Sequence, residues 1–151
     1  MRCPDTRSDR GETLIELLIA VVILGVGAVA IGAGLTTGVL ASDIHRKQST
    51  AGATVRDYGE AIQHAVATGG YVACAAPSVY NAPSGFVVPT GYTASVTAAK
   101  YWNGTAFVAT CSPDRGLQQL SLQVAGADGR ATERLVVVIR KPCGLGDPIC
   151  A

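Results

Sequence analysis

The chain has 151 residues, enough for one domain of ordinary size and too few for two well-packed ones. Hydrophobic residues make up 48% and charged residues only 15%, with a formal net charge of +1. This balance excludes a strongly basic nucleic-acid-binding protein, and no nucleic-acid partner is predicted. The stretch from Leu17 to Ser42 has no charged side chain. It exceeds the roughly 20 apolar residues that cross a bilayer, which argues against an ordinary cytosolic enzyme.

The first half of the chain predicts a long helix behind a short polar leader, residues 1–11. Residues 12–67 contain no proline, and Gly69-Gly70 supplies a helix stop. Within this helix, residues 14–42 are apolar enough to cross a membrane. The remainder is amphipathic, with apolar residues recurring at the three-, four- and seven-residue spacings of one helix face. That face is predicted to consist of Ile44, Ala51, Val55, Tyr58, Ile62 and Ala65.

Residues 68–151 predict a small globular β domain. Four runs have the composition of strands: Thr93–Trp102, Thr105–Cys111, Leu117–Val124 and Arg134–Arg140. Asn103-Gly104 is a two-residue hairpin signal, and residues 126–129 (Gly-Ala-Asp-Gly) favour a turn. Residues 71–92 contain three prolines and are expected to form an ordered loop. We therefore predict an α+β fold, in which an antiparallel sheet of about four strands lies on the amphipathic helix face.

The five cysteines form no CxxC pair and have no zinc-finger spacing, so no metal site is predicted. They are Cys3, Cys74, Cys111, Cys143 and Cys150. If the apolar segment carries the following residues across a membrane, the last four reach an oxidising compartment, where disulfides persist. Four cysteines can pair in three ways.

Other candidate residues are better explained structurally. His45 and His64 are expected to be solvated helix residues, and no catalytic nucleophile accompanies them. The carboxylates of Asp114, Asp128 and Asp147 occur singly beside glycine or proline and match no calcium loop, so they are expected in turns. Asn103 also begins a glycosylation acceptor but is expected in the hairpin turn. Tyr71, Tyr80, Tyr92, Tyr101 and Trp102 are expected to pack in the β domain instead of forming a ligand-binding face. Neither an enzyme nor a cofactor is predicted.

Glu16 is the most unusual residue of the sequence because it lies inside an apolar run. A carboxylate deep in a bilayer costs at least about 2.5 kcal/mol and by default implies a partner. An ordinary secretory signal keeps its apolar region free of acids. The surrounding sequence, residues 10–17, reads Arg-Gly-Glu-Thr-Leu-Ile-Glu-Leu. A polar leader, a basic residue, glycine, one further residue, Thr-Leu-Ile-Glu and an apolar helix together resemble the class III prepilin leader of type IV pilins and pseudopilins.

The resemblance implies that a prepilin peptidase cuts between Gly11 and Glu12 and methylates the new amino group of Glu12. Glu12 stands where the family usually has phenylalanine. Glu16, fifth after the cut, would pair with the amino-terminal ammonium of a neighbouring subunit during filament assembly. The implied partners are identical or related pilin subunits, the prepilin peptidase, assembly-platform proteins and the membrane. The fold implied is pilin-like.

Two further sets of residues fit this resemblance. Ala30, Gly34 and Gly38 repeat every four residues, the small-residue spacing that permits close helix packing; membrane helices also simply tolerate glycine. Among the three disulfide pairings, the resemblance favours Cys74–Cys111 with Cys143–Cys150, which would give a disulfide-closed C-terminal region.

The function expected from the sequence is therefore a structural subunit, a pilin or pseudopilin, of a type IV pilus-like or type II secretion-like filament. The subunit would be anchored in the cytoplasmic membrane by a single span, with an extracytoplasmic head, before joining a cell-surface or periplasmic filament. The alternative is a solitary membrane-anchored protein whose head binds a ligand or mediates adhesion.

Overall fold

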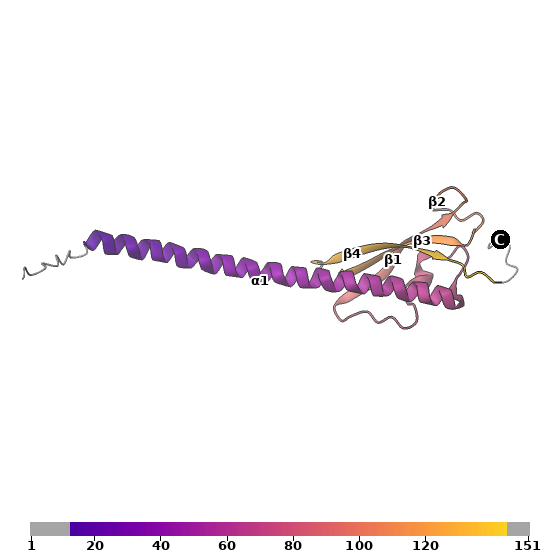
Figure 1. Cartoon of the computed structure of the whole chain (residues 1–151), viewed down its shortest axis with the longest axis horizontal. Helices are drawn as coiled ribbons and strands as arrows, with labels where there is room; N and C mark the ends of the chain where they lie inside the picture. Colours follow the sequence, from indigo (N-terminus) through magenta and orange to yellow (C-terminus); the bar gives the residue numbers. More distant parts are fainter. Residues whose placement is uncertain (1–12, 145–151) are drawn as a thin grey trace, which may run out of the picture. The chain divides into compact units, whose positions relative to one another are not determined.

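The computed structural model describes residues 13–144, which form two compact units divided between Ser42 and Asp43. The proposed cleavage and methylation positions Gly11 and Glu12, and also Cys150, lie outside the described residues. A helix, α1 (Leu14–Ala65), runs for 52 residues through both units (Figure 1).

The predicted helix stop is confirmed. After α1 the chain makes a π-helical turn, Val66–Gly70, in which Gly69 has a φ angle of 101°. A β-carbon at Gly70 would lie 2.7 Å from the Ala65 carbonyl oxygen, so only glycine fits there. The two glycines therefore end the helix for different reasons: Gly69 adopts the left-handed conformation, and Gly70 permits a close backbone approach.

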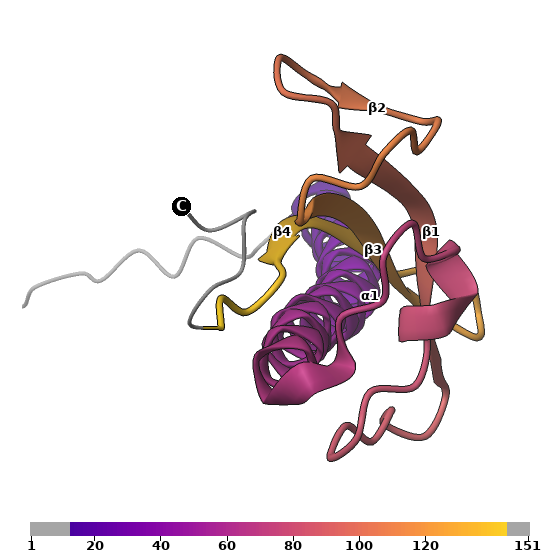
Figure 2. The same ribbon diagram turned by 90° about the vertical axis from the view of Figure 1, so that its right-hand side faces the viewer.

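The second unit contains a four-stranded antiparallel sheet, as the sequence predicted (Figure 1). Its strand order, β2-β1-β3-β4, was not predicted. The strands are β1 (Tyr92–Trp102), β2 (Phe107–Val108), β3 (Leu117–Gly126) and β4 (Thr132–Arg140). A bulge interrupts β1 between Val96 and Ala98. The expected loop before β1 contains a single 3-10 turn, Pro77–Tyr80, and no strand. Looking along α1, Figure 2 shows β3 and β4 beside the second half of the helix.

The hydrophobic core lies between the second half of α1 and one sheet face. Its helix residues include Ala51, Val55, Tyr58 and Ile62, which confirms the centre of the predicted stripe; β3 contributes Leu120, Leu122 and Val124. Gly59 allows α1 and β4 to approach closely, because a β-carbon there would lie 3.2 Å from side-chain carbons of Leu135 and Val137.

The N-terminal end of the predicted helix stripe is wrong, and the C-terminal end is only partly buried. Ile44 is 36% exposed, and Ala65 is only half-buried, whereas Val66 is buried. The first contacts between α1 and the sheet are polar and lie at Lys47, whose carbonyl accepts a hydrogen bond from Tyr92 of β1, whereas the apolar core begins at Ala51. Ile44 precedes Ala51 by about two helical turns and therefore lies outside the apolar core.

Two strand predictions also need correction. The β1–β2 loop spans four residues instead of two, since Trp102 pairs with Phe107. The Asn103 side-chain oxygen accepts hydrogen bonds from the amides of Thr105 and Ala106, both at 2.8 Å, and these bonds take the place of further strand pairing. Asn103 is thus the turn residue that we expected, but β2 is reduced to two residues. In β3 the alternation begins with buried Gln118, whereas Leu117 is half-buried.

Candidate functional site

The first part of α1 exposes an uninterrupted apolar surface. The large hydrophobic side chains from Leu14 to Leu40 are between 52% and 81% exposed. The most apolar 18-residue window of the helix has a mean hydropathy of 2.8 and none of its residues is buried. In the part of the chain that the structure describes, this is the one helix long and apolar enough to cross a membrane. Such a surface requires a lipid or protein environment.

The few polar groups inside this segment are satisfied locally. The Thr36 hydroxyl donates to the Gly32 carbonyl and the Thr37 hydroxyl to the Ala33 carbonyl, both at 3.1 Å. Hydroxyls bonded in this way can enter a bilayer without leaving an unpaired donor. This leaves Glu16 as the segment's single charged group.

Glu16 lies in the first turn of α1, where its amide donates to the Thr13 carbonyl at 2.9 Å. Its side chain is exposed and forms no ion pair with another described residue. A helix N-terminus carries partial positive charge, which favours a carboxylate at this position. The pairing of Glu16 with an amino terminus stays a prediction, as do cleavage and methylation at Gly11 and Glu12.

The predicted packing residues Ala30, Gly34 and Gly38 are all exposed. A β-carbon built at either glycine meets no atom of this chain within 4 Å. The small residues therefore have no packing role within the single chain, and their proposed role in packing between helices is likewise untested.

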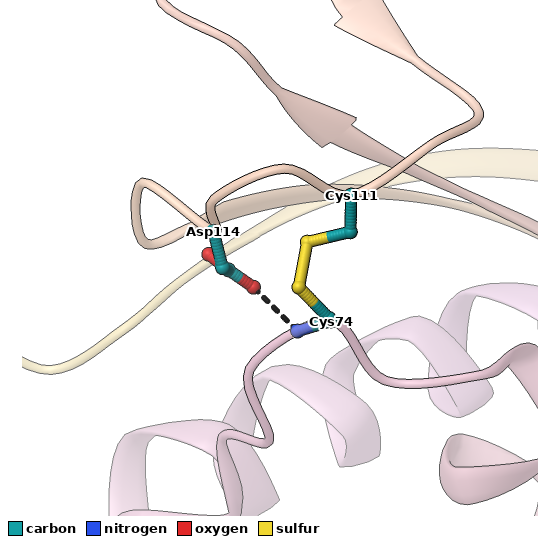
Figure 3. A group of neighbouring side chains, drawn as sticks. All are labelled: Cys74, Cys111 and Asp114. Carbon is teal, nitrogen blue, oxygen red and sulfur yellow. Dashed lines mark hydrogen bonds between the residues drawn. A yellow bond between two sulfur atoms is a disulfide. The ribbon is translucent and has the colours of Figure 1, made fainter.

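In the head, a disulfide joins Cys74 to Cys111, one of the two predicted pairings (Figure 3). It connects the segment after α1 to the β2–β3 loop across a sequence separation of 37 residues. In the chain-entropy model a loop of this length contributes about 4 kcal/mol of stability. Asp114 lies near enough for the three residues to surround a metal ion, but the sulfur atoms are bonded to each other and are not thiolate ligands. The Cys143–Cys150 pairing stays a prediction, because Cys150 is not described.

The Asp114 carboxylate accepts four hydrogen bonds and is much more than the turn residue expected. Two come from the amides of Cys74 and Gly116, at 2.7 and 2.6 Å. The Tyr71 hydroxyl donates at 2.7 Å and the Gln118 side-chain amide at 2.8 Å. Partial burial raises the pKa of Asp114, but the donated hydrogen bonds lower it by more, so the net pKa lies below its usual range. Burial and the neighbouring carboxylate both raise the pKa of Tyr71.

Gln118, which the sequence analysis missed, is fully buried at the centre of this network. Besides Asp114, its amide nitrogen donates to the Val72 carbonyl at 2.8 Å and the Tyr71 hydroxyl at 3.1 Å. Its oxygen accepts from the Tyr80 hydroxyl at 3.4 Å. The network holds the segment after α1 against β3. Because its partners are up to 47 residues away, no local sequence pattern signals this role.

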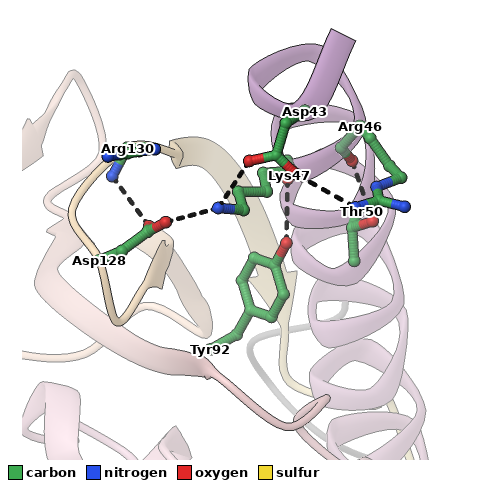
Figure 4. Close-up of polar contacts among 7 residues, drawn as sticks. All are labelled: Asp43, Arg46, Lys47, Thr50, Tyr92, Asp128 and Arg130. Atoms are coloured by element: carbon green, nitrogen blue, oxygen red, sulfur yellow. Dashed lines mark hydrogen bonds and ion pairs between the residues drawn. The ribbon is translucent and has the colours of Figure 1, made fainter. Parts of the chain in front are cut away.

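A second polar cluster fixes the start of the head unit on α1 (Figure 4). The Lys47 ammonium contacts Asp43 at 2.9 Å and Asp128, in the β3–β4 turn, at 2.7 Å. The Tyr92 hydroxyl donates to the Lys47 carbonyl at 3.3 Å. Hydrogen bonds to Asp128 and Asp43 raise the pKa of Lys47, and the ammonium lowers the pKa of Asp128. The ion pairs and hydrogen bonds of this cluster therefore add to the apolar core in holding α1 against the sheet.

The histidines and the buried tyrosines lie as expected. His45 and His64 are exposed on α1. Tyr80 and Tyr101 are buried with their hydroxyls bonded to protein groups, which fits a packing role for the aromatic residues. Asp147 is outside the described residues.

Comparison with known proteins identifies one family model, the prokaryotic N-terminal methylation motif, at residues 6–32. No curated protein and no solved structure matches the chain. The matched residues contain the second half of the polar leader with Gly11, then Glu12, Glu16 and the first part of the exposed apolar helix. The chain thus carries a class III prepilin leader, as the resemblance indicated. The motif supports a type IV pilin- or pseudopilin-like protein, and the helix that follows Gly11 and Glu12 is long and apolar enough to cross a membrane.

Proposed function

We propose that this chain is a filament subunit, a pilin or pseudopilin of a type IV pilus-like or type II secretion-like system. The observation that carries the proposal is the methylation motif at residues 6–32, which extends into the exposed apolar segment of α1, residues 14–42, where Glu16 is the single acid. Before assembly the helix anchors the subunit in the cytoplasmic membrane with the head on the extracytoplasmic side. The disulfide between Cys74 and Cys111 supports this orientation, because disulfides persist in oxidising compartments.

Assembly begins with processing. A prepilin peptidase cuts after Gly11, because its site admits almost no side chain there, and methylates Glu12. In the bilayer the Glu16 carboxylate then attracts the ammonium at the amino terminus of the neighbouring subunit. A carboxylate in hydrocarbon is costly alone, so pairing favours docking in the correct register. Close contact at Ala30, Gly34 and Gly38 follows as helices leave lipid for the filament core.

Replacing Gly11 and Glu16 separates these steps. The full chain is expressed with its peptidase and assembly proteins, and filaments sheared from the cells or trapped in the periplasm are quantified. Gly11→Leu should accumulate as uncut precursor in the membrane. Glu16→Ala should be cut normally but incorporated into filaments at least tenfold less. Glu16→Ala subunits that assemble at the wild-type level would refute the ammonium pairing, and wild-type chains that never enter a filament would refute the proposed function.

A further inference from the structure

The sheet face opposite α1 is both apolar and positively charged. Along β4 the outward residues include Val136 and Val138, which are 57% and 46% exposed. Arg134 and Arg140 lie on the same face by alternation, and Lys100 of β1 joins them through the register Lys100–Gln119–Val138. Arg134 also contacts Gln123 of β3 across this face at 3.1 Å. We call these five residues (Lys100, Arg134, Val136, Val138 and Arg140) the outer sheet face.

No acidic side chain balances the outer sheet face from within the sheet. The single acid of the four strands is Glu133, which pairs with the buried Val124 and therefore points to the α1 side. In the described residues β4 is an edge strand, with β3 on one side and no strand on the other. Exposed valines among unopposed cations along an open edge are typical of a surface that another protein covers.

The opposite side of the same unit carries the complementary charge. Asp57, Glu60 and His64 lie on the side of α1 turned away from the core, all exposed. With Ala61, Ser84 and Gly85 they line an open groove of about 600 Å³. Neither acid has an ion-pair partner within 4 Å among the described residues, although Arg56 precedes Glu60 by four positions, about one helical turn. We call this surface the acidic groove.

We infer that the outer sheet face of one copy docks on the acidic groove of a second copy. The inference rests on the proposed function, and it names the head surfaces that would meet in the filament. Both complementary surfaces belong to one unit, so a second copy of this chain supplies the matching partner. Because the two surfaces differ, the contact is heterologous and leaves one surface of each kind free at the ends, which permits an open-ended polymer. Charge complementarity would set the register and the valines would exclude water.

Site-specific photo-crosslinking in the full chain tests this contact. A photoreactive phenylalanine analogue replaces Val136, and filaments are assembled, irradiated and digested. Mass spectrometry should find Val136 joined to the α1 peptide containing Asp57 and Glu60 from another copy. The same analogue at Thr105, in the β1–β2 loop, is the control and should not capture that peptide. Filaments without the Val136 crosslink would overturn the inference and leave the proposed function standing; a chain that forms no filaments would refute both.

Charge reversal supplies a second readout. Arg134→Glu with Arg140→Glu should lower the Val136 crosslinking yield about four- to twenty-five-fold, since each exposed ion pair changes an equilibrium about two- to fivefold. Asp57→Lys with Glu60→Lys should do the same, and all four substitutions together should restore most of the yield. Arg115→Glu, an exposed cation outside both surfaces, is the matched control. Equal yields for the Arg134/Arg140 reversal and the Arg115 control would overturn the inference, as would failure of the combined variant to recover.

Discussion

Replacing Asp114 by alanine tests the polar network of the head most directly. The substitution removes four hydrogen bonds of 2.6–2.8 Å that end on one carboxylate. Hydrogen bonds to a charged group are each worth about 1.5–3 kcal/mol. The sum of the four hydrogen-bond energies overestimates the loss of stability, because the site is only partly buried and water can reach the freed backbone amides.

The cost is concentrated on the buried members of the network. Gln118 keeps its bond to the Val72 carbonyl, whereas the Tyr71 hydroxyl loses its acceptor. We therefore expect Asp114→Ala to lower the free energy of unfolding by about 2–4 kcal/mol. Asp114→Asn keeps the shape, but it replaces an oxygen that accepts two of these bonds by an NH2 group that faces two donors. It should therefore also destabilise the head, by about 1–3 kcal/mol.

Thermal unfolding of the full chain in detergent micelles measures this effect, with the near-ultraviolet circular dichroism of the head aromatics as the signal. For a unit of about 100 residues, 2–4 kcal/mol corresponds to a decrease of roughly 8–16 °C in Tm. Asp57→Ala, which removes an exposed carboxylate without a hydrogen bond among the described residues, is the control and should change stability by less than about 0.5 kcal/mol. If Asp114→Ala unfolds at the same temperature as Asp57→Ala, the network does not stabilise the head.

Two further predictions concern the contact between α1 and the sheet. Gly59→Leu should destabilise the head by about 1–3 kcal/mol, because a side chain there collides with Leu135 and Val137, and chemical denaturation measures the loss. The lowered pKa of Asp128 means that its contribution to stability is complete above the unfolded pKa of about 3.9 and is lost as pH falls through the lower folded value. Lys47→Met should reduce the acid-induced loss of stability over this range. If the free energy of unfolding depends on pH in the same way in the variant and the wild type, the Lys47–Asp128 pair does not contribute to stability.

The helix and most strands could be predicted because their signals are local. Apolar periodicity, the absence of proline and the Gly69-Gly70 stop define α1, and two-residue alternation defines most of β3. The prediction of buried residues failed where contacts between residues far apart in the sequence determine burial. Ile44 continues the apolar stripe in sequence, but it lies outside the apolar core.

The polar centre of the head was unpredictable for the same reason. A glutamine in a strand with two-residue alternation is expected to face solvent, yet Gln118 is buried because Tyr71, Val72 and Asp114 satisfy it from other parts of the chain. Asp114 precedes Gly116 and forms the expected turn bond, but its three other donors come from residues that only the folded chain brings together. By contrast, the leader motif is contiguous in sequence, so the prepilin leader could be predicted from sequence alone.

The central claim is that this chain is a prepilin matured by cleavage after Gly11. The mass of the mature amino-terminal peptide, taken from chains produced with their own peptidase, tests it most directly. We predict a chain that begins at N-methylated Glu12. A mature chain that begins near Ile31, as after ordinary signal cleavage, or that still begins at Met1 would contradict the account.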